Sequence, residues 1–181
     1  MIVKHKFRNH MVSKETKILI LGTFHPDIAT DADFFYGRPR NYLWRILPGC
    51  FKQPDLKNSE LNKKLSFMKN YHIDFMDLIC CLDIPEEGDM FNYNDSFIDR
   101  YINKYNDLTH IISELQNLTA VYFTRITFNN IPNIKNEILL IQKYCSKEKI
   151  RFDFLHTPSR HGNQKKINSW VNVIINKSND K

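Results

Sequence analysis

The chain has 181 residues, with 26 Lys and Arg against 20 Asp and Glu, so its formal net charge at pH 7 is +6. Hydrophobic residues make up 42% of the chain and aromatic residues 13%, which is enough for a packed interior and excludes a disordered chain. The longest apolar runs, such as 18–21 and 171–175, are far shorter than the ~20 residues that cross a bilayer, so we expect no membrane span. The positive charge suits an anionic partner such as nucleic acid, although solubility alone would also explain it.

The amino-terminal segment and the cysteines indicate the compartment. Residues 1–17 are basic but lack an apolar stretch followed by small residues, so they do not resemble a secretory signal, and we expect a cytoplasmic protein. The four cysteines include the adjacent pair Cys80 and Cys81 and form no Cys-x-x-Cys motif. This pattern favours buried free thiols over a disulfide framework or a zinc site.

Strand and helix patterns alternate in the first half of the chain. The apolar run 18–21, which ends in Gly22, predicts a strand that is buried on both faces. A long loop and a helix over 41–47 follow, and Pro48-Gly49 predicts the end of that helix. A helix over 59–71 and a second strand over 73–80 come next.

The second half continues the alternation. Apolar residues at a spacing of three to four predict one long amphipathic helix over 97–115. A strand over 119–124, a helix over 134–144, a strand over 150–155 and a closing helix over 167–175 complete the chain. The pattern predicts an α/β fold with a mostly parallel sheet of four strands. With no repeat and no linker, residues 1–181 are expected to form a single domain.

Two loops are the expected place for chemistry, because ligands of open α/β sheets bind outside the carboxyl ends of the strands. The first loop reads Gly-Thr-Phe-His-Pro-Asp over 22–27, and the second reads His-Thr-Pro-Ser-Arg-His-Gly over 156–162. Both are rich in polar and ring side chains.

These loops carry a resemblance to a known family. Gly-Thr-Phe-His-Pro at 22–26, Phe-Phe-Tyr-Gly-Arg-Pro-Arg-Asn-Tyr-Leu-Trp at 34–44 and His-Thr-Pro-Ser at 156–159 together resemble the uracil-DNA glycosylase superfamily, especially its hypoxanthine-DNA glycosylase-like branch. The resemblance implies a three-layer α/β/α sandwich that extrudes a damaged base from DNA and hydrolyses its N-glycosidic bond with water. It implies no metal and no other cofactor, and we expect a monomer whose partner is DNA with a deaminated base.

The resemblance also implies roles in the first loop. Tyr36 matches the aromatic residue that stacks on the extruded base, with loop packing as the alternative, and Thr23 and Phe24 are expected to contact the base as well. Phe24 stands where most branches have a catalytic Asn or Asp, and it can neither orient nor deprotonate water. Asn41 is the candidate holder of the attacking water, with helix capping as the alternative. His25 is a second catalytic candidate, because histidine is a common general base, although a lone loop histidine is more often structural.

The late loop is expected to assist the leaving base and to hold DNA. Thr157 stands where other branches have His or Asn, and its hydroxyl can donate a hydrogen bond but cannot carry charge. Ser159 is expected to contact a phosphate. Arg160 and His161 match the family's wedge into the base stack, although Arg160 also suits a solvated surface.

Further basic residues lie near both loops in the sequence. If they share one face, Arg38, Arg40, Arg45, Lys165 and Lys166 form a phosphate-binding surface; otherwise they are scattered solubilising charge. Asp77 matches an Asp common in the family, with loop anchoring as the alternative.

The expected function is therefore a DNA glycosylase of base-excision repair that acts on hypoxanthine or uracil. A DNA-binding protein without hydrolysis is the alternative, because Phe24 and Thr157 both replace polar catalytic types and fold does not fix function. An iron–sulfur glycosylase is disfavoured, because the cysteine spacing does not match the branches that hold a cluster.

Overall fold

The computed structural model describes residues 1–28 and 32–176. Four parallel strands form the central sheet in the order β3-β2-β6-β7. Their bounds are β2 Ile18–Gly22, β3 Ile73–Asp77, β6 Ala120–Phe123 and β7 Arg151–Phe154. The predicted four-stranded parallel sheet is confirmed, and the carboxyl ends of its strands share one edge.

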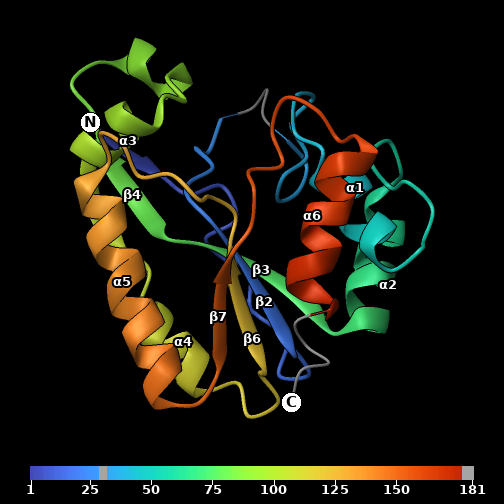
Figure 1. The fold of residues 1–181 in the computed structure, drawn as a ribbon. Helices are drawn as coiled ribbons and strands as arrows, with labels where there is room; N and C mark the ends of the chain where they lie inside the picture. The colour runs from blue at the N-terminus through green and yellow to red at the C-terminus, as the bar shows by residue number, and fades with distance from the viewer. Residues whose placement is uncertain (29–31, 177–181) are drawn as a thin grey trace.

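Helices cover both faces of this sheet, so the predicted three-layer sandwich is also confirmed (Figure 1). One layer consists of α1 Leu43–Cys50, α2 Leu61–Tyr71 and α6 Gln164–Ile174. The other layer consists of α3 Asp95–Arg100, α4 Leu108–Ser113 and α5 Pro132–Lys147. Within residues 1–28 and 32–176, no helix is long and apolar enough to cross a membrane.

The uninterrupted apolar run of β2 reflects its burial on both faces of the sheet. Leu19 and Leu21 belong to the core on the α5 side of the sheet, whereas Ile20 belongs to the core under α1 and α6. All three side chains are fully buried. Because successive residues of a strand point to opposite faces, a strand covered on both sides requires apolar residues at every position.

The chain after β3 departs from the prediction. The strand expected over 73–80 ends at Asp77, and β4 Ile79–Asp83 begins after Leu78. Strand β4 lies in a second, antiparallel sheet between β1 Ile2–Lys4 and β5 Ile102–Tyr105. The sequence analysis did not predict this sheet.

The single long helix expected over 97–115 is wrong. Helix α3 ends at Arg100, β5 pairs with β4, and α4 begins only after Asp107, whose carboxylate accepts the N–H of His110. The apolar residues have helical spacing, but tertiary pairing outweighs a local pattern of this kind.

Helix α1 continues through the predicted stop at Pro48-Gly49. Pro48 has no N–H to donate to the carbonyl oxygen of Trp44, and the N–H of Leu56 donates to that oxygen at 2.8 Å instead. The carbonyl group that proline would leave unpaired is therefore satisfied, and the helix ends at Cys50.

Candidate functional site

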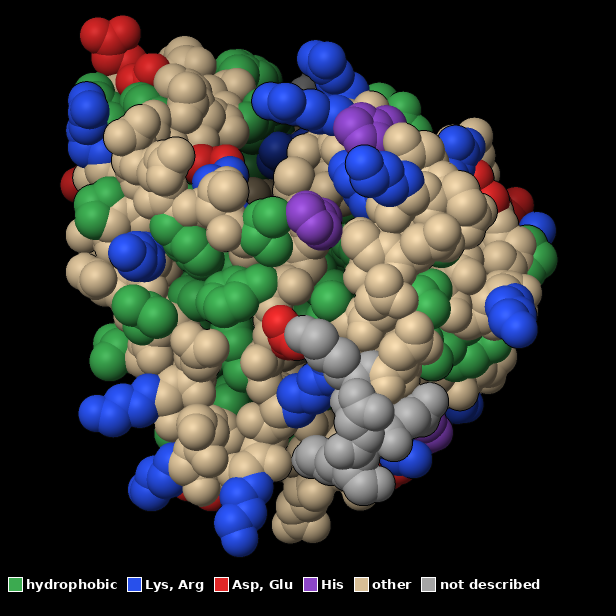
Figure 2. Space-filling view, in the orientation of Figure 1, with side chains coloured by type: hydrophobic (Ala, Val, Ile, Leu, Met, Phe, Trp, Pro, Cys, Tyr) green, Lys and Arg blue, Asp and Glu red, His purple; other side chains and the backbone are tan. Residues whose placement is uncertain are grey.

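A cavity of about 690 Å³ lies at the carboxyl edge of the central sheet. Gly22 and Asp77 are the last residues of β2 and β3, Thr124 follows β6, and His156 lies two residues beyond β7; all four line the cavity. Figure 2 shows Lys, Arg and His side chains around the hollow above the strand ends. The hollow thus lies where open α/β sheets bind their ligands.

Two loops that are distant in the sequence join to form the rim of this cavity. The N–H of Tyr42 donates to the carbonyl oxygen of Pro158 at 2.8 Å, and the N–H of Arg160 donates to that of Arg40 at 3.1 Å. Asn41 and Ser159 form an antiparallel β-bridge between these two bonds. Backbone hydrogen bonds therefore fix the two loops to each other.

Most of the candidate site residues line this one cavity. They are Thr23, Phe24, His25, Tyr36, Arg38, Asn41, Thr157, Ser159, Arg160 and His161. Arg40 and Lys165 are not among the described residues that line it, whereas Lys166 is. The structure thus brings the two groups of residues together, and their individual roles stay predictions.

Tyr36 forms part of the inner wall. Its side chain is only 6% exposed, its ring lies 5.6 Å from that of Phe75, and its hydroxyl lies 3.1 Å from Oγ1 of Thr124. The loop that carries Tyr36 is packed against the protein, because residues 34–35 are buried and carry the turn into the core. Burial and then the charge of Asp77 raise the pKa of Tyr36 well above its ordinary value, although the bond to Thr124 lowers it, so the phenol keeps its proton.

Gly22 allows two polar groups to approach the end of β2. A Cβ atom at this position would lie 2.1 Å from Oδ1 of Asp77 and 2.8 Å from the hydroxyl of Tyr36. Real side chains do not tolerate such distances, so only glycine fits here. The absence of a side chain at residue 22 places a carboxylate and a phenol together at the base of the cavity.

Asn41 precedes Tyr42, the N-cap residue of α1, and its side chain forms a turn at the start of the helix without being the cap itself. Its Oδ1 accepts the N–H of Leu43 at 2.9 Å, at the start of α1. The side chain also lines the cavity. Part of its hydrogen-bonding capacity therefore serves the helix, and an amide oxygen has a second lone pair for a ligand or a water.

The late loop is tied together by its own side chains. The hydroxyl oxygens of Thr157 and Ser159 lie 3.0 Å apart, and the ammonium group of Lys166 donates to the carbonyl oxygen of Ser159 at 2.9 Å. Partial burial and then the positive charge of Arg160 lower the pKa of Lys166. The rim therefore concentrates positive charge beside the two hydroxyl groups.

The opposite side of the cavity includes residues that the sequence analysis missed. Tyr93 and Asp95, beyond the 3₁₀ helix η1 Glu87–Phe91, line the cavity together with Arg125. The guanidinium group of Arg38 lies 3.7 Å above the ring of Tyr93, and Arg125 forms an ion pair with Asp95. No local motif marks these residues, because their position depends on how the segment after β4 folds over the sheet.

A buried cluster of three polar side chains lies at the end of β3. Asp77, His5 and His25 are 0%, 2% and 8% exposed. Oδ2 of Asp77 lies 2.8 Å from Nε2 of His5 and 2.8 Å from Nδ1 of His25. Asp77 was expected from the sequence as a family match or a loop anchor, whereas His5 was not a candidate; His5 reaches the cluster because β1 pairs with β4.

Asp77 is held as a carboxylate anion. Burial by itself raises its pKa, but the electrostatic interaction with His25 and the hydrogen bonds from His25 and His5 outweigh burial and keep the pKa well below its ordinary range. Its second oxygen, Oδ1, is buried and has no hydrogen-bond partner among the described residues. The cluster thus presents one fully used oxygen and one unused oxygen.

The same cluster meets the distance requirement for a metal site, since its three donor atoms lie within 4.8 Å of one another. However, the N–H of Phe7 donates to Nδ1 of His5 at 3.1 Å. A neutral imidazole has one N–H and one acceptor, so the proton of His5 is on Nε2 and is directed at Asp77. With both ring nitrogens engaged, His5 has no lone pair for a metal ion, and we interpret the cluster as a hydrogen-bond network.

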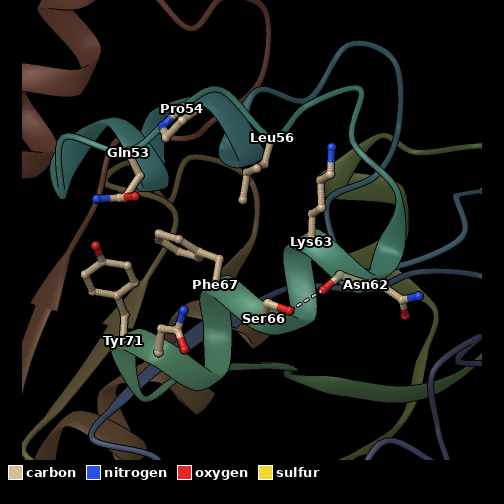
Figure 3. A pocket seen from close by; sticks show the side chains of 9 residues that line it. Gln53, Pro54, Leu56, Asn62, Lys63, Ser66, Phe67 and Tyr71 are labelled. Carbon is tan, nitrogen blue, oxygen red and sulfur yellow. Dashed lines mark hydrogen bonds between the residues drawn. The ribbon is translucent and has the colours of Figure 1, made fainter.

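A second cavity, of about 550 Å³, lies between α2 and the segment that follows α1 (Figure 3). Gln53, Pro54 and Leu56 face Phe67 and Tyr71 across it, and the hydroxyl of Ser66 donates to the carbonyl oxygen of Asn62. Among the described residues that line it there is no carboxylate and no histidine. Acid–base chemistry is therefore better served by the cavity at the sheet edge.

Comparisons with known proteins support the fold. No model of a protein family matches the chain, and no curated protein matches it significantly. The chain is similar to the solution NMR structure of a protein from Methanosarcina acetivorans that is provisionally named a uracil DNA glycosylase. The two share 19% sequence identity and superpose with a TM-score of 0.64 over 96% of each chain. The chain therefore has the uracil-DNA glycosylase-like fold.

Proposed function

We propose that this protein is a DNA glycosylase that extrudes a deaminated base, hypoxanthine or uracil, and hydrolyses its N-glycosidic bond. The observation that carries the proposal is the junction of two distant loops into one rim around a cavity at the carboxyl edge of the sheet. The similar structure from Methanosarcina acetivorans supports the choice of a nucleic-acid substrate.

The inner wall suits a flat heterocycle. Phe24 and Tyr36 supply ring surfaces, and the hydroxyl groups of Tyr36 and Thr124 supply hydrogen bonds beside them. Stacking on an aromatic ring is worth ~1–3 kcal/mol per base, and the polar groups then select among bases. In this proposal Thr23 contacts the base from the end of β2.

The rim suits a nucleic-acid backbone. Arg38, Arg160, His161 and Lys166 line the cavity, and its described lining has four Lys and Arg side chains against two carboxylates. Cationic side chains of this kind bind phosphates whatever the base sequence, and they fix the position of the strand over the cavity. Ser159 contacts the phosphate next to the extruded nucleotide.

The chemistry requires help at both ends of the breaking bond. A positively charged sugar and an anionic base develop together, so the site must stabilise charge and position a water. Asn41 and His25 are the candidates for the water, and Thr157 donates a hydrogen bond to the departing base. Because a neutral hydroxyl stabilises an anion less than a cation does, we expect slow turnover.

A DNA-binding protein without hydrolysis is the second candidate. It is favoured by Phe24 and Thr157, which place an aromatic ring and a hydroxyl where stronger catalytic groups are expected. In that case the protein binds damaged DNA tightly, with a steep dependence on salt, and releases no base.

The test is incubation of the protein with duplexes that each contain a single uracil, hypoxanthine, xanthine or mismatched thymine, followed by alkaline cleavage of abasic sites. We expect strand scission on at least one of the duplexes with a deaminated base. No scission on any duplex would reject the glycosylase, and salt-dependent binding without scission would favour the second candidate.

Two matched variants test the water holder. Asn41→Ala removes the amide that lines the sheet-edge cavity, and Asn70→Ala removes an amide from the other cavity. We expect at least a tenfold loss of the single-turnover rate in the first variant and no loss in the second. Full cleavage by Asn41→Ala would exclude Asn41 as the water holder and leave the glycosylase in place.

A further inference from the structure

The buried cluster at the end of β3 explains more than the stability of the sheet edge. Asp77 accepts two hydrogen bonds at a single oxygen, one from each of two histidines, and both Asp77 and His25 line the cavity. His5 lies behind the carboxylate and does not line the cavity. Of the two histidines that share Asp77, His25 is therefore the one that reaches the cavity wall.

The hydrogen bonds fix the protons on both histidines. The N–H of Phe7 makes Nδ1 of His5 an acceptor, so His5 is neutral and donates to Asp77 through Nε2. Nδ1 of His25 lies 2.8 Å from the same carboxylate oxygen, which accepts and does not donate, so Nδ1 carries the proton of His25. In neutral His25 the lone pair is then on Nε2.

Nε2 of His25 is available for chemistry. It has no hydrogen-bond partner among the described residues, and it is not sealed from solvent as Oδ1 of Asp77 is. Rings of His5, Phe7 and Tyr36 pack around the imidazole and hold its orientation. A lone pair on a fixed ring in a cavity wall can accept a proton from a water bound beside it.

We propose that His25 is the base that deprotonates the attacking water, and that Asp77 and His5 are positioning residues that act through it. The inference rests on the proposed glycosylase function and specifies its catalytic groups. The water oxygen bonds to the anomeric carbon while the bond from that carbon to the base nitrogen breaks, and its electron pair leaves with the base. The proton of water passes to Nε2 of His25, which returns it to the anionic base or to solvent.

The charges around His25 favour this role. Asp77 stabilises the imidazolium that forms when His25 accepts a proton, because an anion lies 2.8 Å from its other nitrogen. His5 and Tyr36 also contact the ring, and both are neutral, since Nδ1 of His5 accepts the N–H of Phe7 and burial keeps the proton on Tyr36. The charged groups elsewhere in the cavity wall are Arg38, Asp95, Arg125, Arg160 and Lys166. Of these, Arg125 and Asp95 neutralise each other as an ion pair.

The first experiment measures the proton directly. Nitrogen-15 NMR of the wild-type protein near neutral pH is expected to show His25 with its proton on Nδ1 and a free lone pair on Nε2. A proton on Nε2 instead of Nδ1 would overturn the inference without any measurement of activity.

The second experiment measures single-turnover excision with matched variants. His25→Asn keeps a donor close to the place of Nδ1 and removes Nε2, and we expect a loss of roughly 10²–10⁴-fold, the usual contribution of a general base, with unchanged DNA affinity. Asp74→Asn is the control, because Asp74 lies in the same strand and is also buried, but it does not line the cavity. Its Oδ1 lies 2.7 Å from Nε2 of His10. We expect it to excise at the wild-type rate.

The variant Asp77→Asn tests whether Asp77 acts through His25 or serves only the stability of the fold. The loss of the anion makes imidazolium less stable, so we expect the acid limb of the pH–rate profile to move to lower pH, together with at least a tenfold lower rate at the optimum. An unmoved acid limb would remove Asp77 from the proposal, and full activity of His25→Asn in an active wild-type background would overturn it. A wild-type protein that excises no base would instead overturn the proposed function.

Discussion

Replacement of Gly22 by alanine tests the packing that brings the site together. The added Cβ would lie 2.1 Å from Oδ1 of Asp77, which is fully buried and is held by hydrogen bonds from two histidines. We expect a cost of about 1–3 kcal/mol for the overlap, and a further ~1–3 kcal/mol if the displaced carboxylate loses one of its two histidine hydrogen bonds. For a chain of this length, 3 kcal/mol corresponds to a fall in Tm of about 6–12 °C.

The matched control for this substitution is Gly88→Ala. Nothing lies within 4 Å of a Cβ at Gly88, and its φ angle is not in the left-handed region. We expect its free energy of unfolding to stay within about 0.5 kcal/mol of the wild type. Both variants are compared by urea unfolding and by thermal unfolding at pH 7. Equal stability of the two variants would refute the close approach of Asp77 to Gly22.

Three other predictions follow from the structure. Burial raises the pKa of the Cys50 thiol to about 12 and that of the Cys145 thiol to about 11. We therefore expect both thiols to react with a disulfide reagent at pH 8 far more slowly in the native protein than in denaturant. Equal rates would contradict their burial. The folded protein holds the pKa of Asp77 below its unfolded value of ~3.9, so the stability from this group is present above about pH 4 and is lost as pH falls. Asp77→Asn should therefore flatten the acid dependence of the unfolding free energy by up to ~1.4 kcal/mol per pH unit. An unchanged slope would contradict this prediction. If Arg160 contacts one phosphate, Arg160→Gln should reduce the slope of log affinity against log salt by ~0.9. Lys143→Gln on α5, outside the sheet-edge cavity, should leave the slope unchanged. Identical slopes for Arg160→Gln and the wild type would remove Arg160 from the interface.

The central sheet was predictable because its signals are local. The run 18–21 is apolar at every position since both faces of β2 are covered, and no distant information is needed to recognise such a strand. The place of the cavity follows from the same sheet, because parallel strands bring their carboxyl ends to one edge. The meeting of the loops at Asn41 and Ser159 could therefore be expected before their bridge was seen.

The second sheet was not predictable in the same way. Residues 102–105 lie in a segment with helical spacing of apolar residues, and they form a strand only because β4 offers an unpaired edge. The position of His5 depends on β1, which joins the other side of β4 and pairs Lys4 with Cys81. A histidine in a short basic segment has no local signal for burial, so its contact with Asp77 could be found only from the fold.

The turn at Tyr36 could be predicted from the sequence, but its burial could not. Gly37 and Pro39 correctly indicate a turn, and Tyr36 has a φ of 57° within it. Turn residues, however, report backbone conformation and not exposure. The neighbouring Phe34 and Phe35 are 7% and 0% exposed, and they carry the tyrosine inward with them.

The two buried carboxylates of β3, Asp74 and Asp77, differ in how their oxygens are hydrogen-bonded. Both oxygens of Asp74 are used, because Oδ1 contacts His10 and accepts the N–H of Phe75 while Oδ2 accepts the N–H of Ser13. Asp77, three residues later, concentrates its bonds on one oxygen and leaves the other without a partner among the described residues. An unsatisfied buried acceptor costs about 1–3 kcal/mol, so a purely structural carboxylate is expected to look like Asp74. The different arrangement at Asp77, at the end of the strand that reaches the cavity, supports the role that we propose for this residue.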